Sequence, residues 1–391
     1  MLLDDESEVT NILSLFGFEV VHQHKGARLG RMRTPHGVIE TPVFMPVGTQ
    51  ATLKSVLPGD VWDTGTRIML SNAYHLYLRP GPQVVKEHGG LHKFMNWPGA
   101  TLTDSGGFQV MSLGHMVSLT DEGARFRSHI DGSLVEFGPQ ESIKAQVDIG
   151  ADIIMCFDEC PPYPVSEEGA VESARRTLLW AKKAKAMDIP ESQALFGIVQ
   201  GSTFPHLRKQ CALELAALDF PGYALGGLAV GEPKKDFYEI TNLTTAYLPA
   251  DKPRYLMGVG HPYDLVEGVL AGVDMFDCVL PSRNARHGRA FTFQGSVNLR
   301  NKKHMADHSP IEEGCDCLSC QGFSRSYIRH LFVAGESLAW TLVTVHNLRF
   351  FQRLMAEIAA HVENGTVESY KDHIMRIYPV DLADDADEER L

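Results

Sequence analysis

The sequence predicts an α/β protein built on a (β/α)8 (TIM) barrel, with N-terminal antiparallel strands and an inserted or C-terminal zinc-binding subdomain. Two observations carry this prediction. Eight short apolar runs, most ending in small polar residues, alternate with stretches of helical length, which is typical of a parallel sheet. Three cysteines then fall within residues 315–320, a density that indicates a metal site.

The eight apolar runs extend over about 240 residues, which suits eight strand–helix units. They are residues 42–48, 67–72, 101–107, 152–159, 194–201, 223–228, 255–260 and 274–280. Residues 167–187, 207–218 and 264–271 place apolar side chains at helical spacing between them. Because barrel active sites lie at the C-terminal strand ends, the polar residues at the end of each run are the candidate active-site residues.

Two regions depart from this alternation. Residues 18–41 are typical of antiparallel strands with a turn at 34–37, and residues 300–350 hold the cysteines and then a long helical pattern. The expected division of the chain follows: N-terminal extension 1–17, barrel with its N-terminal sheet 18–299, zinc-binding subdomain 300–350, helical part packing on the barrel 351–380, and acidic tail 381–391.

The composition is that of an ordinary globular protein. Of 391 residues, 44% are hydrophobic and 22% charged, which excludes a disordered, coiled-coil or collagen-like chain. No run of about 18 apolar residues occurs, so we expect no membrane-spanning helix. The N-terminus lacks the layout of a signal peptide, so we expect a cytoplasmic protein with reduced thiols.

The net charge of −13 taken alone argues against a nucleic-acid partner, but the charge is uneven. Residues 1–10 contribute −4 and residues 381–391 contribute −5, which leaves −4 for the body. Residues 281–304 hold six basic side chains and no acidic one. This stretch is either a phosphate-contacting patch or a solvated surface loop.

The cysteine cluster is Cys315-x-Cys317-x2-Cys320. A structural zinc site needs four nitrogen or sulfur ligands, so a histidine is expected as the fourth, and a closed site has no open position for catalysis. The alternative is a reduced cysteine loop without metal. Spacing leaves four histidines open: His330 and His346 downstream, His304 and His308 upstream.

Three aspartates follow apolar runs where a barrel would place chemistry: Asp104, Asp158 and Asp277. Paired carboxylates at one site can divide into a nucleophile and a general acid/base, as in glycosidic-bond chemistry. For any single one the alternative is capping of the next helix, and Asp104 followed by Ser105 is ambiguous on this count. Three such positions in one chain favour a functional site.

Other residues at the strand ends suit a flat, purine-like ligand. Asp158, Gln200 and the backbone near Gly227 offer donors and acceptors for a base edge. Phe108 and Met257 are suited to sandwich a ring, although both are equally suited to filling the barrel top. The glycines at these ends form no dinucleotide-binding fingerprint.

These motifs resemble the bacterial-type tRNA-guanine transglycosylases, or queuine tRNA-ribosyltransferases, from about Phe18 to Tyr378. Besides the cysteine cluster, they are TPVFMPVGT (41–49), TDSGGFQ (103–109), FDEC (157–160), GGLAVGE (226–232) and DCVLP (277–281). The resemblance implies a glycosyltransferase (pentosyltransferase) that replaces guanine at wobble position 34 of GUN-anticodon tRNAs (Asp, Asn, His, Tyr). The incoming base would be 7-aminomethyl-7-deazaguanine, in queuosine biosynthesis.

The resemblance also implies roles for individual residues. Asp277 would be the nucleophile that forms a covalent RNA intermediate, and Asp104 the general acid/base. The implied base-binding residues are Asp104, Ser105, Gly106, Gly107, Phe108, Asp158, Gln200, Gly227, Leu228 and Met257, with Glu232 orienting the peptide after Leu228. The implied RNA-binding residues are Gly258, Val259, Gly260, His261, Pro262, Tyr263, Asp264, Ser282, Arg283, Asn284, Ala285 and Arg286. The implied metal ligands are Cys315, Cys317, Cys320 and His346.

The implied cofactor is one structural Zn2+ per subunit, and the implied partners are the tRNA anticodon loop, guanine and a second copy of the chain. Phe108 departs from family members with Tyr there and lacks one hydroxyl. Cys160 and Val230 resemble the pocket for the aminomethyl base, so an enzyme using queuine is the alternative. The rivals are a non-catalytic tRNA-binding partner subunit and an unrelated zinc-dependent barrel hydrolase.

Overall fold

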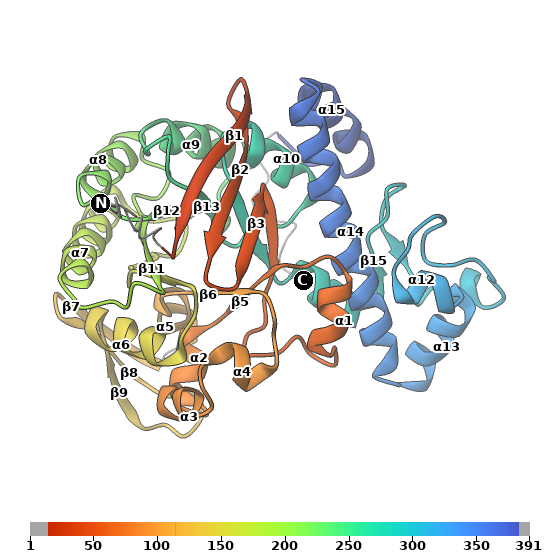
Figure 1. The fold of residues 1–391 in the computed structure, drawn as a ribbon, viewed down its shortest axis with the longest axis horizontal. Helices are drawn as coiled ribbons and strands as arrows, with labels where there is room; N and C mark the ends of the chain where they lie inside the picture. The colour runs from red at the N-terminus through yellow and green to blue at the C-terminus, as the bar shows by residue number, and fades with distance from the viewer. Residues whose placement is uncertain (1–14, 114, 383–391) are drawn as a thin grey trace, which may run out of the picture.

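The computed structural model describes residues 15–113 and 115–382, and its centre is an eight-stranded parallel barrel (Figure 1). The strands are β4 (Val43–Pro46), β5 (Ile68–Ser71), β6 (Ala100–Thr103), β10 (Ile153–Met155), β11 (Ala194–Val199), β12 (Gly222–Leu225), β13 (Arg254–Leu256) and β14 (Met275–Cys278). They are ordered β4-β14-β13-β12-β11-β10-β6-β5, and a parallel bridge from Val47 to Leu70 closes the ring. Each predicted run overlaps one of these strands, and three of them start one residue after the strand begins, so the predicted barrel is confirmed.

Helices surround the strands on the outside of the barrel (Figure 1). They are α1 (Pro58–Asp63), α2 (Ala73–Leu78), α3 (Pro82–Glu87), α4 (Leu91–Met95), α5 (Gly107–Leu113), α6 (Pro139–Ile149), α7 (Glu167–Lys185), α8 (Pro205–Ala216), α9 (Lys234–Ala246), α10 (Pro262–Leu270) and α11 (Leu280–Arg286). The three helical stretches predicted from spacing correspond to α7, α8 and α10.

Alternation along the strands decides which side chains enter the barrel. In β14, Met275 belongs to the interior cluster, whereas Phe276 packs in the cluster shared with the outer helices. In β6, Ala100 and Leu102 belong to the interior cluster in the same way. Because side chains alternate with a period of two, the inward direction continues to residues 277 and 104. Two predicted catalytic aspartates thus occupy inward-facing positions.

An antiparallel sheet covers the N-terminal end of the barrel (Figure 1). It consists of β1 (Gly17–His24), β2 (Ala27–Thr34) and β3 (Gly37–Thr41), and the predicted turn at 34–37 joins the last two. Met32 and Ile39 from this sheet pack into the interior cluster of the barrel. The bottom of the barrel is therefore sealed, and its open end is the one that carries the carboxyl ends of the strands.

A second antiparallel sheet lies between β6 and β10 in the chain and was not predicted. It comprises β7 (His115–Thr120), β8 (Gly123–Arg127) and β9 (Leu134–Phe137). In β8 and β9, exposed residues alternate with buried or partly buried ones, so neither strand contains a continuous apolar run. Phe126 and Phe137 anchor the sheet in a cluster with Tyr74 and Trp180.

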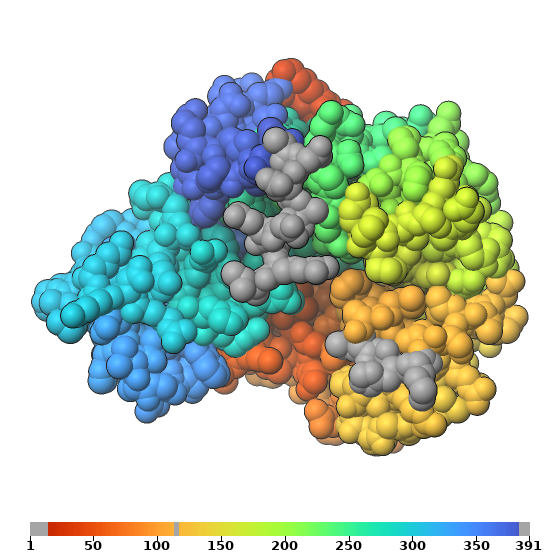
Figure 2. Space-filling model, turned by 180° about the vertical axis from the view of Figure 1, so that it is seen from behind, coloured from red at the N-terminus to blue at the C-terminus, as the bar shows by residue number. Residues whose placement is uncertain are grey.

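The chain then forms a lobe beside the barrel, coloured cyan to blue in Figure 2. Its elements are β15 (Arg289–Ala290), β16 (Val297–Asn298), the 3-10 helix η1 (Lys302–His304), α12 (Leu318–Gly322), α13 (Arg325–Ala334) and α14 (Leu338–Glu363), followed by α15 (Val367–Ile377). Helix α14 is continuous through residue 350, the expected end of the zinc-binding subdomain. Its second half packs Phe351 and Leu354 into the core between barrel and helices.

In the ranges that the structure describes, no helix combines the length and the apolar character needed to cross a membrane. Of the expected N-terminal extension, residues 1–14 lie outside the described ranges. The same holds for residues 383–391 of the expected acidic tail.

Candidate active site and metal centre

Asp104 lies just after β6, and its buried carboxylate is held from one side by the start of α2. Oδ1 accepts a hydrogen bond from the backbone N–H of Ala73 at 2.8 Å, and Oδ2 accepts one from the side-chain amide of Asn72. The pKa of Asp104 is raised to about 7, chiefly by burial; the two hydrogen bonds oppose this rise, and the nearby charges of Asp277 and Asp158 add to it. This carboxyl can therefore both give and take a proton near neutral pH.

Asp277, in β14, is buried and accepts two hydrogen bonds at the same oxygen. Tyr255 donates its hydroxyl to Oδ1 at 2.6 Å, and the backbone N–H of Gly258 donates to the same atom at 2.7 Å. Burial raises the pKa of Asp277, whereas these two bonds act in the opposite direction because they favour the charged form. Oδ1 is thus fixed, and the other oxygen is the one available for chemistry.

Asp158 forms a hydrogen-bonded group with residues from two other strand ends. Its Oδ1 accepts from the Ser105 hydroxyl at 2.6 Å, and its Oδ2 accepts from the Gln200 amide at 2.8 Å. Burial raises the pKa of Asp158. The Gln200 Oε1 is buried and has no hydrogen-bond partner among the described residues. An unpaired buried acceptor costs free energy, so this atom is suited to receive a donor from a ligand.

Two glycines allow backbone to lie directly against this group. A Cβ added at Gly227 would lie 2.2 Å from Gln200 Oε1, and the residue has a φ of +62°. A Cβ at Gly107 would lie 2.3 Å from the Asp158 carbonyl oxygen. Only glycine fits these positions without a shift of the neighbouring groups, so the loops after β12 and β6 close tightly around the Asp158–Gln200 pair.

Glu232 fixes the peptide that follows Leu228. Its carboxylate accepts hydrogen bonds from the backbone N–H groups of Ala229 and, at 2.9 Å, Val230. The carbonyl and N–H of a trans peptide point in opposite directions, so the Leu228 carbonyl is directed away from Glu232. Glu232 is thus placed to orient the peptide after Leu228, the role expected for it.

The two residues expected to sandwich a ring differ in their surroundings. Phe108 has a side chain 52% exposed, so it does not fill the core. Met257 is partly buried against the interior cluster. The other expected base-binding positions, Ser105, Gly106, Gly107 and Leu228, are buried at the ends of β6 and β12.

The two expected RNA-binding segments have different exposure. In residues 258–264 most side chains are buried, and Asp264 accepts hydrogen bonds from Tyr238 at 2.6 Å and Lys234 at 2.8 Å. In residues 282–286, Ser282 and Ala285 are buried, Asn284 and Arg286 half-buried, and Arg283 exposed. Arg283 is therefore the side chain of α11 that is most open to a phosphate.

The cysteine cluster converges on one histidine. Nδ1 of His346, in α14, lies 3.7, 3.7 and 3.3 Å from the Sγ atoms of Cys315, Cys317 and Cys320. A tetrahedron with bonds of about 2.0–2.3 Å has ligand–ligand edges of about 3.6 Å, so these four atoms fit one zinc ion. Nε2 of His346 contacts the Phe291 carbonyl at 2.7 Å, which leaves Nδ1 deprotonated for the metal.

A second group of metal-ligating side chains, His36, His92 and Asp152, lies at the sealed end of the barrel. Asp152 accepts from Nδ1 of His36 at 2.7 Å and Nε2 of His92 at 3.0 Å. The two imidazole rings are stacked, with centroids 3.4 Å apart and planes at 13°. Two stacked rings cannot both direct an in-plane lone pair at one ion. This group therefore serves as a set of hydrogen bonds that links the start of β3 to the barrel.

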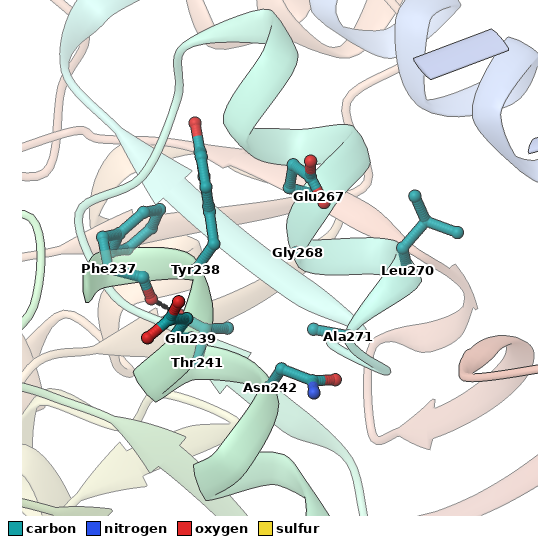
Figure 3. A pocket seen from close by; sticks show the side chains of 9 residues that line it. All are labelled: Phe237, Tyr238, Glu239, Thr241, Asn242, Glu267, Gly268, Leu270 and Ala271. Atoms are coloured by element: carbon teal, nitrogen blue, oxygen red, sulfur yellow. Dashed lines mark hydrogen bonds between the residues drawn. The ribbon is translucent and has the colours of Figure 1, made fainter. Parts of the chain in front are cut away.

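A surface hollow on the outer wall of the barrel lies apart from the carboxylates (Figure 3). Residues of α9 and α10 line it, among them Tyr238, Asn242 and Glu267, and none is an expected site residue. The chemistry-bearing groups thus gather at the strand ends and not in this hollow.

Comparison with known proteins agrees with this arrangement. Residues 23–380 match the family model described as "Queuine tRNA-ribosyltransferase". A protein of that name from Symbiobacterium thermophilum is 59% identical over 346 residues, covering 88% of this chain and 86% of its own. Others so named, from Pelotomaculum thermopropionicum and Desulforamulus reducens, are 55% and 53% identical over 91% and 92% of this chain and 96% and 97% of theirs.

Proposed function

Because the chain belongs to the queuine tRNA-ribosyltransferase family of pentosyltransferases, we propose that it exchanges guanine at position 34 of GUN-anticodon tRNAs for 7-aminomethyl-7-deazaguanine. One observation carries the proposal: Asp104 and Asp277, buried at one barrel mouth, have different hydrogen-bond environments. One carboxyl is suited to exchange protons, and the other is fixed by two hydrogen bonds that favour its charged form.

In the proposed reaction, the free oxygen of Asp277 attacks C1′ of nucleotide 34. The new bond joins the carboxylate oxygen to C1′, and the bond from C1′ to N9 of guanine breaks. Asp104 supplies the proton that the leaving guanine needs. The incoming base then gives a proton to Asp104 and attacks C1′, which releases Asp277. Two displacements retain the configuration, as in retaining glycosidases.

The Asp158–Gln200 group and the backbone at Gly227 would read the base. Asp158 accepts from N–H groups of a purine edge, and the unpaired Gln200 Oε1 adds a further acceptor. The Leu228 carbonyl, held in direction by Glu232, would accept from the aminomethyl group. The exposed Phe108 and the partly buried Met257 would hold the ring between them. An enzyme of this kind that takes queuine is the alternative for the incoming base.

The zinc ion would be held by Cys315, Cys317, Cys320 and His346. When bound, it supplies a structural cross-link and no Lewis-acid chemistry, because all four positions are occupied by protein. The link joins the α12 segment to α14, which also packs on the barrel.

The proposed partner is the tRNA anticodon loop, contacted through Arg283, Arg286 and the other basic residues of 281–304. Arg289, Arg300, Lys302 and Lys303 are exposed in this stretch, which supports contact with phosphates. Because the reacting base must reach the barrel mouth, recognition requires a splayed loop. The protein would act as a homodimer in the cytoplasm.

Labelled guanine exchange tests this function. Wild type should incorporate guanine at position 34 of a GUN-anticodon tRNA and form a denaturant-resistant adduct with a trapping base analogue. Asp277→Asn should do neither while retaining zinc and thermal stability. Asp219→Asn, at an exposed position in the loop between α8 and β12, should behave as wild type. Folded wild type that binds tRNA without exchange would support the non-catalytic partner reading. Use of queuine but not the aminomethyl base would overturn the assigned substrate.

A further inference from the structure

Arg208 is a fully buried cation directly behind the proposed base-binding loops. It lies in the first turns of α8, and its exposed fraction is 0%. It makes no ion pair with a carboxylate among the described residues, and burial lowers its pKa to about 10. Burying a charge destabilises the fold unless its hydrogen bonds are satisfied. The groups that accept hydrogen bonds from this guanidinium therefore indicate its role.

The guanidinium donates only to backbone carbonyls. Nε donates to Ser202 at 2.7 Å, and Nη1 donates to Val199 at 3.0 Å and Gly226 at 2.7 Å. Nη2 donates to Gly227 at 3.1 Å. The planar fork of arginine thus ties the loop after β11 to the loop after β12, a geometry that a lysine ammonium cannot reproduce.

These contacts set the direction of the Gly227 N–H. Because a trans peptide directs its C=O and N–H oppositely, holding the Gly226 carbonyl toward Arg208 turns the Gly227 N–H away from it. On the far side lies Gln200: Cβ atoms added at Gly226 and Gly227 would lie 2.8 and 2.2 Å from its amide. The backbone of the two glycines is therefore enclosed between Arg208 and Gln200.

The same side chain fixes the segment that carries Gln200. The Val199 and Ser202 carbonyls, on either side of it, both accept from Arg208. The Gln200 backbone N–H lies 3.4 Å from Cys211 Sγ, one turn further along α8. A Cβ at Gly201 would lie 2.9 Å from the Arg208 backbone nitrogen, so the loop lies directly on the helix.

We propose that Arg208 is the positioning residue of the base-binding site: it holds Gln200 and the Gly227 N–H where they read the edge of a guanine-type base. It does not touch the base. This inference rests on the proposed function. It adds a residue that controls affinity for the base, and that residue takes no part in the displacement at C1′.

The test compares Arg208→Lys with a matched buried arginine. Arg28, 3% exposed at the sealed end, also donates to two backbone carbonyls, those of Ala250 and Lys252 at 2.7 Å, and pairs with Asp274. Steady-state guanine exchange gives kcat and separate KM values for guanine and tRNA. Equilibrium dialysis of labelled guanine gives its Kd, and thermal unfolding and zinc content report folding.

Arg208→Lys should raise the KM and Kd for guanine about tenfold or more, the effect of losing one or two hydrogen bonds to the base, while kcat and the tRNA KM change less than about threefold. Arg28→Lys should lower thermal stability and leave the guanine KM unchanged. Arg208→Gln, which loses the fork and the charge, should show a larger KM effect than Arg208→Lys.

The proposal is overturned if folded Arg208→Lys binds guanine like wild type, or if guanine and tRNA KM values rise together. It also fails if neither Arg208 variant folds, because the residue then serves the fold as a whole. If wild type itself does not exchange guanine, the proposed function fails instead, and the dialysis result still decides whether Arg208 governs base affinity.

Discussion

The hydroxyl of Tyr255 lies 2.6 Å from Oδ1 of Asp277 and donates a hydrogen bond to it. Tyr255 is fully buried in β13, and its side chain belongs to the interior cluster of the barrel. Burial and the adjacent Asp277 charge hold the pKa of this phenol well above its usual value, so it remains a donor throughout the working range of pH.

Tyr255→Phe should lower kcat for guanine exchange about ten- to hundredfold, because a hydrogen bond to a charged group contributes about 1.5–3 kcal/mol. The KM values should change little. Tyr223→Phe is the control: Tyr223 is buried in the neighbouring β12, and its hydroxyl accepts from the Phe220 N–H at 3.1 Å, away from the carboxylates. Equal kcat values for Tyr255→Phe and wild type would contradict the assigned role of this contact.

The rate of the first displacement should change with pH near 7 because of Asp104. Its protonated form donates to the leaving guanine, so single-turnover adduct formation should slow as pH rises above the pKa of about 7. Asp104→Asn should be slow at every pH and lack this pH dependence. A wild-type profile that is flat from pH 6 to 9 would show that another group handles the proton.

The same raised pKa predicts how stability changes with pH. Folded Asp104 binds its proton more tightly than the unfolded chain does, so the stability it contributes is full below pH 4 and is lost as pH rises through about 7. Relative to wild type, Asp104→Asn should therefore gain about 2–4 kcal/mol in free energy of unfolding between pH 4 and 8. Denaturant titration at both pH values measures this difference, and no gain would argue against a buried, uncharged Asp104.

Purified protein should contain one equivalent of zinc per chain. His346→Ala should lose the metal and several kcal/mol of stability, because a structural zinc contributes its binding free energy to folding. His304→Ala is the control, since His304 lies in the same lobe but pairs with Asp307 at 2.8 Å. Metal analysis and thermal unfolding measure both effects. Zinc retained in full by His346→Ala would exclude this histidine as a ligand.

Glu232→Gln should weaken the preference for the aminomethyl base over guanine. A neutral amide can accept from only one of the two N–H groups that the carboxylate holds, so the Leu228 carbonyl loses its fixed direction. Competition between the two bases should shift about tenfold toward guanine. Glu141→Gln, which alters a carboxylate that caps α6 through the Gly138 N–H, should leave the ratio unchanged.

Arg283→Ala should raise the KM for tRNA and reduce the dependence of binding on salt. One lost phosphate contact lowers the slope of log K against log salt by about 0.7–0.9. Arg33→Ala removes an exposed arginine from β2, at the sealed end of the barrel, and should change neither quantity. A slope equal to that of wild type would place Arg283 away from the RNA backbone.

Local sequence predicted the barrel well because each strand is a buried apolar run that ends in small or polar residues. The cysteine spacing likewise predicted a metal cluster, and the family resemblance selected His346 among the candidate histidines. The sheet β7–β9 was missed because its strands are not continuous apolar runs; in Gly123–Arg127, for example, apolar and charged residues alternate.

The supporting groups of the site could not be predicted from spacing. Tyr255 reaches Asp277 only through the pairing of β13 with β14, in which Tyr255 lies opposite Met275. Arg208 is followed by Lys209 on an outer helix, and two adjacent basic residues are typical of a solvated surface. Asn72 meets Asp104 across neighbouring strand ends. Each contact depends on register and packing between segments that are distant in the chain.

Closure of the barrel has a consequence for how the protein is made. The first barrel strand, β4, pairs with the last, β14, and the Phe44 ring stacks on Phe351 of α14 at 4.5 Å. During synthesis, β4 therefore stays unpaired on this edge until β14, more than half the chain away, has left the ribosome. The nascent chain exposes an apolar strand edge throughout that interval, so it should be most prone to aggregation until β14 has emerged and paired with β4.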